Sequence, residues 1–221
     1  MPKPWFIGRY LDPLSWLNEA LFGLVMALSF TLGASLIVAE GANATRDLLV
    51  AVIGCNLAWG LIDGGIFLMS NLCERSRKAR LMDLVRTAPD EAAALALIGG
   101  ELDERLAPLG TAEDRTRLYQ ALLPRLARLP TERVRVTPAD FMGALATFVV
   151  VALTTIPAVV PFLLIDDLLL ALRVSNGVMI ALLFVIGFMW ARTSHANPWL
   201  FGSAFLMAGI AMVLTALALG G

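Results

Sequence analysis

Lysine, histidine and cysteine are scarce in this chain of 221 residues. The lysines are Lys3 and Lys78, the single histidine is His195, and the two cysteines are Cys55 and Cys73. No Cys-x-x-Cys pair or zinc-ligand spacing occurs, so the sequence predicts neither a disulfide framework nor a structural zinc site. The net charge is -1 and neither end carries a basic arm, so no nucleic-acid partner is expected.

Charged residues are also few, at 16% of the chain, whereas 58% of it is hydrophobic. A soluble domain carries roughly 45–50% apolar and about 25% charged residues. The apolar excess is gathered in five runs, residues 20–39, 48–72, 141–165, 174–191 and 198–221. Each run except the fourth reaches the roughly 20 residues that a helix needs to cross a bilayer, and none alternates like a strand. We therefore predict an all-α polytopic membrane protein with five transmembrane helices in a lipid bilayer.

The runs divide the chain into three parts. Residues 1–72 hold an N-terminal segment and two spans, residues 73–138 form a polar helical domain, and residues 139–221 hold three more spans. All basic residues except Arg46 and Arg173 fall on the side of the polar domain. The positive-inside rule then places the N-terminus and this domain in the cytoplasm and the C-terminus outside. The preference for arginine over lysine indicates a bacterial source, and so the inner (plasma) membrane.

The first span is expected to be retained, because its apolar run is too long for a signal peptide and no clean cleavage site follows it. In the polar domain, residues 74–87 should continue the second span as a helix. Residues 89–91 (Pro-Asp-Glu) should form the first turn of a second helix, which the pair Gly99-Gly100 should end. The stretch from Thr111 to Asp114 resembles a capping box that opens a third helix.

An acidic group in the polar domain, formed by Glu101, Asp103 and Glu104, has two interpretations. Its oxygen atoms could hold a divalent cation, with Glu101 and Glu104 as the candidate ligands. Alternatively, the group is a solvated helix face beside Arg105, as most charge runs are.

Two carboxylates lie at or within the spans, where an ionisable residue indicates a functional site because its burial is costly. Asp63 lies in the second span, on one stripe with Asn56, and Glu19 lies at the start of the first, on a face with Met26 and Ser29. Two carboxylates, an amide and a thioether would suit a soft-to-borderline divalent metal. A carboxylate at this depth could also exchange protons.

Each of these residues has a plainer interpretation. Glu19 could lie at the membrane interface, paired with Arg9 or a headgroup. Asp63 could be a hydrogen-bonding residue between helices, and Met26 could serve packing alone.

Other features of the spans concern helix shape. Pro157 and Pro161 should bend the third span and free backbone carbonyls, either to line a transport pathway or for packing. Gly60 and Gly64 form a small-xxx-small pair that lets another helix approach closely.

The order of two spans, a cytoplasmic helical domain and three spans resembles the vacuolar iron transporter family. Similar local motifs occur at residues 22–25 (FGLV), 32–35 (LGAS), 155–162 (TIPAVVPF) and 171–175 (ALRVS). The resemblance implies a divalent-metal/proton exchanger and a homodimer with its first helices near the two-fold axis. This chain departs from the family at Phe22, where the family has an aspartate; the nearest carboxylate is Glu19, one turn earlier.

The expected function is therefore the export of iron-like or manganese-like ions from the cytoplasm in exchange for protons. The alternative is a non-transporting membrane scaffold whose arginine-rich cytoplasmic domain binds a partner or lipid headgroups. An enzyme is not expected, because the sequence has no Ser/His pair, His/Glu metal motif or nucleophile elbow, and no resident cofactor is expected.

Overall fold

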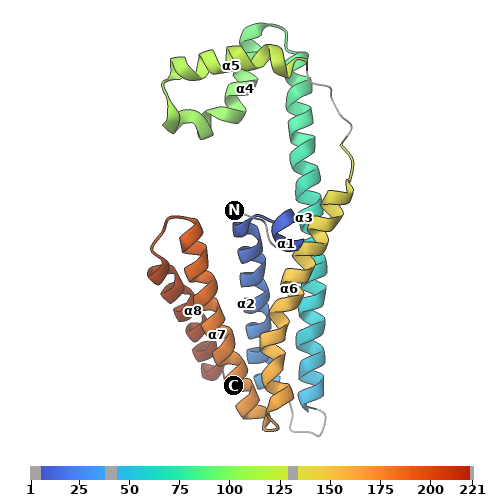
Figure 1. The fold of residues 1–221 in the computed structure, drawn as a ribbon, viewed down its shortest axis with the longest axis vertical. Coiled ribbons are helices and arrows are strands. Elements are labelled where there is room, and N and C mark those ends of the chain that lie inside the picture. The colour runs from blue at the N-terminus through green and yellow to red at the C-terminus, as the bar shows by residue number, and fades with distance from the viewer. Residues whose placement is uncertain (1–5, 38–43, 129–133, 220–221) are drawn as a thin grey trace. The chain divides into compact units, whose positions relative to one another are not determined.

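The structure, a computed structural model, describes residues 6–37, 44–128 and 134–219. Helices are the only regular elements in these residues, which confirms the all-α prediction for them (Figure 1). The elements are α1 (Phe6–Tyr10), α2 (Pro13–Ile37), α3 (Ala44–Arg86), α4 (Glu91–Leu106), the 3-10 helix η1 (Ala107–Leu109), α5 (Ala112–Leu126), α6 (Pro138–Leu164), α7 (Leu168–Thr193) and α8 (Pro198–Ala218).

The chain forms two compact units. The first, here called the bundle, comprises Met1–Leu68 and Pro138–Gly221, and the second, the insert, comprises Met69–Thr137. Helix α3 runs from the bundle into the insert without a break, as the sequence predicted for residues 74–87.

Five of the described helices, α2, α3, α6, α7 and α8, are long and apolar enough to cross a membrane. They correspond to the five predicted spans. The fourth is longer than its apolar run, because Asp167 caps α7 by accepting a hydrogen bond from the Leu170 amide and starts the helix before Arg173. Similarly, α2 begins at Pro13, so Glu19 lies in its second turn and not ahead of it.

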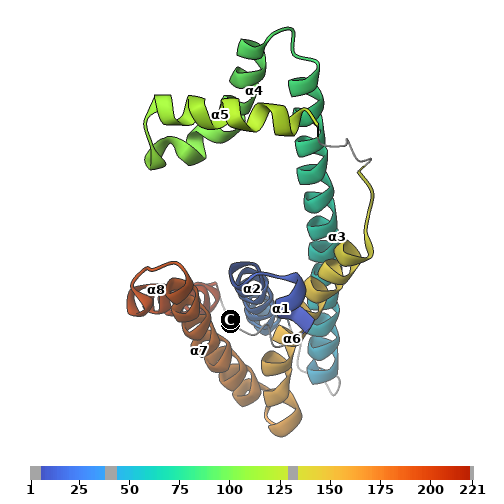
Figure 2. The same ribbon diagram turned by 45° about the horizontal axis from the view of Figure 1, so that its top comes forward.

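Helices α7 and α8 lie side by side in both ribbon views (Figures 1 and 2). Asn197 caps α8 through hydrogen bonds to the Trp199 and Leu200 amides. Glycines then let the two helices approach: a Cβ built on Gly187 would lie 2.9 Å from the Phe201 carbonyl oxygen. Small residues take this role in membrane bundles because no hydrophobic force drives helices together in lipid.

Helices α3 and α6 pack through the predicted Gly60 and Gly64 pair. A Cβ on Gly60 would lie 3.2 Å from the Phe148 carbonyl oxygen, and a Cβ on Gly64 would lie 2.8 Å from that of Ala144. By contrast, Gly65 has open space where a Cβ would be. The backbones of the two helices therefore meet at Gly60 and Gly64.

The insert has its own small apolar core, centred on Val85, Ala94, Ile98 and Tyr119. Asp90 caps α4, and Thr111 and Asp114 form the capping box of α5, which confirms both predicted helix starts. The predicted end of α4 at Gly99 is wrong. The helix continues to Leu106 because Gly99 is buried within it, where a Cβ would lie 3.5 Å from the Tyr119 ring.

The contact between α3 and α6 predicts opposite effects for two adjacent glycines. Both Gly64→Ala and Gly65→Ala gain up to about 1 kcal/mol of helix propensity. Only Gly64→Ala forces a methyl group against the Ala144 carbonyl, so we expect it to destabilise the bundle by about 1–3 kcal/mol. Thermal unfolding of both variants in detergent measures the difference, and equal melting temperatures would contradict this packing.

Candidate functional site

The two intramembrane carboxylates belong to neighbouring helices of the bundle. Glu19, on α2, and Asp63, on α3, are both half-buried. The two helices are neighbours, because Asn56 of α3 donates a hydrogen bond to the Gly23 carbonyl of α2, one turn after Glu19. Arg9, the predicted alternative partner of Glu19, lies over the Tyr10 ring, 5.9 Å from its centroid. The structure therefore places Glu19 and Asp63 on neighbouring helices, and their meeting in one cavity remains a prediction.

Asn56, two turns before Asp63 on α3, joins three helices. Its side chain is 1% exposed. The Nδ2 atom donates to Thr155 Oγ1 on α6 at 2.9 Å and to the Gly23 carbonyl of α2 at 3.3 Å. Gly23 in turn lies against the Thr154 side chain, and any Cβ there would collide with it. The absence of a side chain at Gly23 thus lets α2 approach α6 and leaves the Gly23 carbonyl accessible to the Asn56 amide group.

The acceptor oxygen of Asn56 has a different environment. Among the described residues, Asn56 Oδ1 is buried and accepts no hydrogen bond. Its role in a transport pathway remains a prediction, but the structure adds Thr155 as a partner that sequence reasoning did not single out. In the sequence, Thr155 lies in an apolar run, and no neighbouring residue indicates that its hydroxyl would contact Asn56.

A second set of polar contacts ties α7 to the other helices. Ser175 Oγ donates to the Ala158 carbonyl of α6 at 2.8 Å, and Thr31 Oγ1 of α2 donates to Asn176 Oδ1 at 2.7 Å. Ser175 and Thr31 are both completely buried. Polar side chains in lipid are commonly satisfied in this way, by bonds between helices.

The two prolines of α6 lie beside this contact. The helix continues through Pro157 and Pro161, although neither has an amide hydrogen to donate. Ala158, between them, gives its carbonyl to Ser175. The prolines therefore lie where α6 packs on α7, and their role in a pathway remains a prediction.

Met26 and Ser29 are not shown in contact with the carboxylates. Met26 is half-buried on α2. Ser29 Oγ donates to the Val25 carbonyl of its own helix at 2.7 Å, and it lines a groove of about 550 Å³ with residues of α8 that include Met212 and Thr215. Ser29 thus faces α8.

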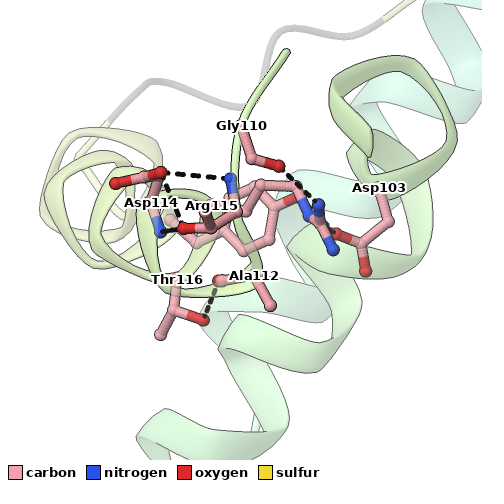
Figure 3. A network of polar contacts seen from close by, with 8 residues as sticks. Asp103, Gly110, Ala112, Asp114, Arg115 and Thr116 are labelled. Carbon is pink, nitrogen blue, oxygen red and sulfur yellow. Dashed lines mark hydrogen bonds and ion pairs between the residues drawn. The ribbon is translucent and has the colours of Figure 1, made fainter. Parts of the chain in front are cut away.

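Two members of the acidic group in the insert, Glu101 and Asp103, have arginine partners. Glu101 lies 3.4 Å from Arg77 Nη2, and Asp103 accepts a 3.0 Å hydrogen bond from Arg115 Nε (Figure 3). Arg115 also donates to the Gly110 carbonyl. No group of three or more His, Cys, Asp and Glu residues that could hold a metal occurs in the described residues. Glu101 and Glu104 as metal ligands remain a prediction.

Two further ion pairs lie at the start of the insert. Glu74 lies 3.1 Å from Arg77 and 3.2 Å from Lys78. These pairs are exposed, so each contributes little stability.

Neither a scan of protein-family models nor a search of curated proteins gives a match to this chain. The resemblance to the vacuolar iron transporter family remains a prediction from the quoted motifs.

The contacts of Asp103 affect the pKa of a buried tyrosine, Tyr119. Tyr119 donates its hydroxyl to Asp103 Oδ1 at 2.7 Å, and burial, followed by this hydrogen bond, raises the pKa of Tyr119 above its usual value. The raised pKa stabilises the folded insert below pH ~10, and this contribution is lost as the pH rises through the folded value. We expect Asp103→Asn to lower the pKa of Tyr119, measured by ultraviolet titration of tyrosinate.

The chain has two tyrosines, so this titration is cleanest with Tyr10→Phe as the background. Glu104→Gln, an exposed change on the same helix, is the matched control and should leave the titration unchanged. An identical tyrosine titration in Asp103→Asn and its parent would show that Asp103 does not act on Tyr119.

Proposed function

We propose that this chain is a membrane transporter that exports a divalent metal ion, of the iron or manganese kind, from the cytoplasm in exchange for protons. The observation that carries the proposal is the placement of two half-buried carboxylates, Glu19 and Asp63, on neighbouring helices of an apolar bundle. Two carboxylates on neighbouring transmembrane helices are expensive to maintain without a function.

The chemistry of such a pair favours exchange. Two carboxylates at close range repel each other when both are ionised, so they bind either protons or a cation. A divalent cation neutralises both charges at once, and its departure leaves them ready to take up protons. Binding of the metal and of protons is therefore mutually exclusive at this pair, which is the requirement for antiport.

The remaining parts of the proposal rest on sequence. The distribution of basic residues favours a cytoplasmic insert in a bacterial inner membrane. The resemblance to the vacuolar iron transporter family supports the substrate class and a homodimer. Phe22, at the position of the family's aspartate, is 54% exposed, and Glu19 replaces that aspartate as the acidic group of α2.

A second candidate is a non-transporting scaffold whose insert binds a partner or lipid headgroups. The observation in its favour is the surface of α5. Arg117 and Arg125 are exposed on one side of α5, away from the buried Tyr119, and Arg128 is exposed in the turn that follows the helix. Such a basic face would attract anionic groups.

The transporter proposal predicts that Asp63→Asn abolishes transport and leaves folding intact. The amide keeps the shape of Asp63 but removes the charge, so we expect Mn²⁺-driven proton flux to fall by at least about tenfold. The measurement is flux in proteoliposomes with Mn²⁺, Fe²⁺ and Zn²⁺ offered in turn, with a pH-sensitive dye inside.

Asp47→Asn is the matched control, because Asp47 is an exposed carboxylate at the start of the same helix. It should transport like the wild type. Normal flux in folded Asp63→Asn would remove Asp63 from the mechanism. No flux with any metal from folded wild-type protein would favour the scaffold, and neutralising Arg117, Arg125 and Arg128 would then be the next test.

A further inference from the structure

One threonine in the bundle has an unusual environment. Thr147 of α6 is completely buried, and its Oγ1 atom has no hydrogen-bond partner among the described residues. Buried hydroxyls in helices normally bond a carbonyl of the preceding turn, as Thr154 does with Val151 on the same helix. A buried polar atom without a partner is rare enough to require an explanation.

The packing of α6 on α3 fixes the depth of Thr147. A Cβ on Gly60 would lie 3.4 Å from Val151 Cβ, and a Cβ on Gly64 would lie 2.8 Å from the Ala144 carbonyl oxygen. Residues 144–151 of α6 therefore face residues 60–64 of α3. Thr147 lies within the first stretch and Asp63 within the second, so both are at the same level of the bundle.

The packing of α6 on α2 brings Glu19 to this level. Gly23 of α2 touches Thr154, which lies seven residues, or two turns, after Thr147 on the same face. Glu19 lies one turn before Gly23. Helical side chains extend toward the N-terminus of their helix, and α2 and α6 run in the same direction (Figure 1). The side chain of Glu19 thus extends away from the level of Gly23 and Thr154 and toward the level of Thr147.

We propose that the Thr147 hydroxyl is a third oxygen ligand, with the carboxylates of Glu19 and Asp63, in a binding site for a hard divalent cation of the Mn²⁺ class. This inference rests on the proposed transport function and specifies its ligands. The unpartnered Thr147 oxygen is the observation that carries it, because this buried hydroxyl lies at the level of Asp63 and would add a neutral oxygen donor to the two carboxylates.

The donor set distinguishes this site from the soft-to-borderline site that the sequence suggested. Met26 lies two turns beyond Glu19 on α2, outside this level. Carboxylate and hydroxyl oxygens suit Mn²⁺ and Mg²⁺, whereas sulfur ligands select softer ions. Asn56 Oδ1, the other unpartnered oxygen, lies two turns from Asp63 on α3 and is the next oxygen donor for an ion that leaves the site.

The test measures Mn²⁺ binding to the full-length protein in detergent, by the electron paramagnetic resonance signal of free Mn²⁺. Thr147→Val keeps the shape of the side chain and removes its oxygen, so we expect Mn²⁺ affinity to fall about tenfold. Thr147→Ser restores the hydroxyl and should recover most of the affinity. Thr215→Val is the matched control, because Thr215 is exposed on α8 and bonds the Ala211 carbonyl of its own helix.

Thermal unfolding gives an independent readout. Without metal, Thr147→Val replaces an unpartnered hydroxyl with a methyl group, so we expect it to raise the melting temperature. With saturating Mn²⁺, the same variant should gain less stability than the wild type. A merely structural threonine would change the first quantity without changing the second.

A gain of soft-metal binding completes the test. Thr147→Cys puts sulfur in place of the oxygen, so the Cd²⁺ affinity should rise relative to Mn²⁺ by at least about tenfold. If the wild type binds and transports Mn²⁺ but Thr147→Val and Thr147→Cys match it in affinity and selectivity, this inference is wrong and the transport function stands. If the wild type neither binds nor transports any metal, both are wrong. Should Thr147→Val fail to fold, Thr147→Ser and Thr147→Cys decide the question.

Discussion

The structure depends on one constraint: polar groups buried in a bundle of apolar helices must find partners within the protein. The helices satisfy the hydrogen bonds of the backbone. Buried polar side chains follow the same rule by bonding a group on a neighbouring helix. Asn56 bonds Thr155 and the Gly23 carbonyl, and Ser175 bonds the Ala158 carbonyl. These bonds join α2, α3, α6 and α7 into a unit with specific neighbours. Within the described part of the bundle, two buried side-chain oxygens, Asn56 Oδ1 and Thr147 Oγ1, depart from this rule.

Close approach of the helices makes these bonds possible. A side chain at Gly23 would collide with Thr154, so only glycine lets α2 come near enough for its carbonyl to accept from Asn56. Gly64 allows the same approach between α3 and α6. The close contacts at these glycines therefore hold together the helices that carry Glu19 and Asp63, so the proposed chemistry depends on the packing.

The sequence predicted what depends on local patterns. Run lengths identified the five long helices, and the capping residues Asp90 and Thr111 marked helix starts correctly. It failed at Gly99, because a glycine pair signals a helix end only when no tertiary contact stabilises the helix through it. It also missed Thr147: a threonine within an apolar run looks the same whether its hydroxyl bonds its own helix, as that of Thr154 does, or bonds nothing. That difference depends on which helix lies opposite, and periodicity does not encode it.

The carboxylates of the two units differ in their partners, and this difference decides where a cation would act. In the insert, Glu74, Glu101 and Asp103 each lie within ion-pair distance of an arginine. Their charge is already compensated, so a metal would have to displace a guanidinium. In the bundle, Glu19 and Asp63 lie on neighbouring apolar helices, and on the proposed function their shared partner is a proton or a cation. A cation that acts there would meet carboxylates that no guanidinium already neutralises, which is why the proposal places it in the bundle and not at the paired carboxylates of the insert.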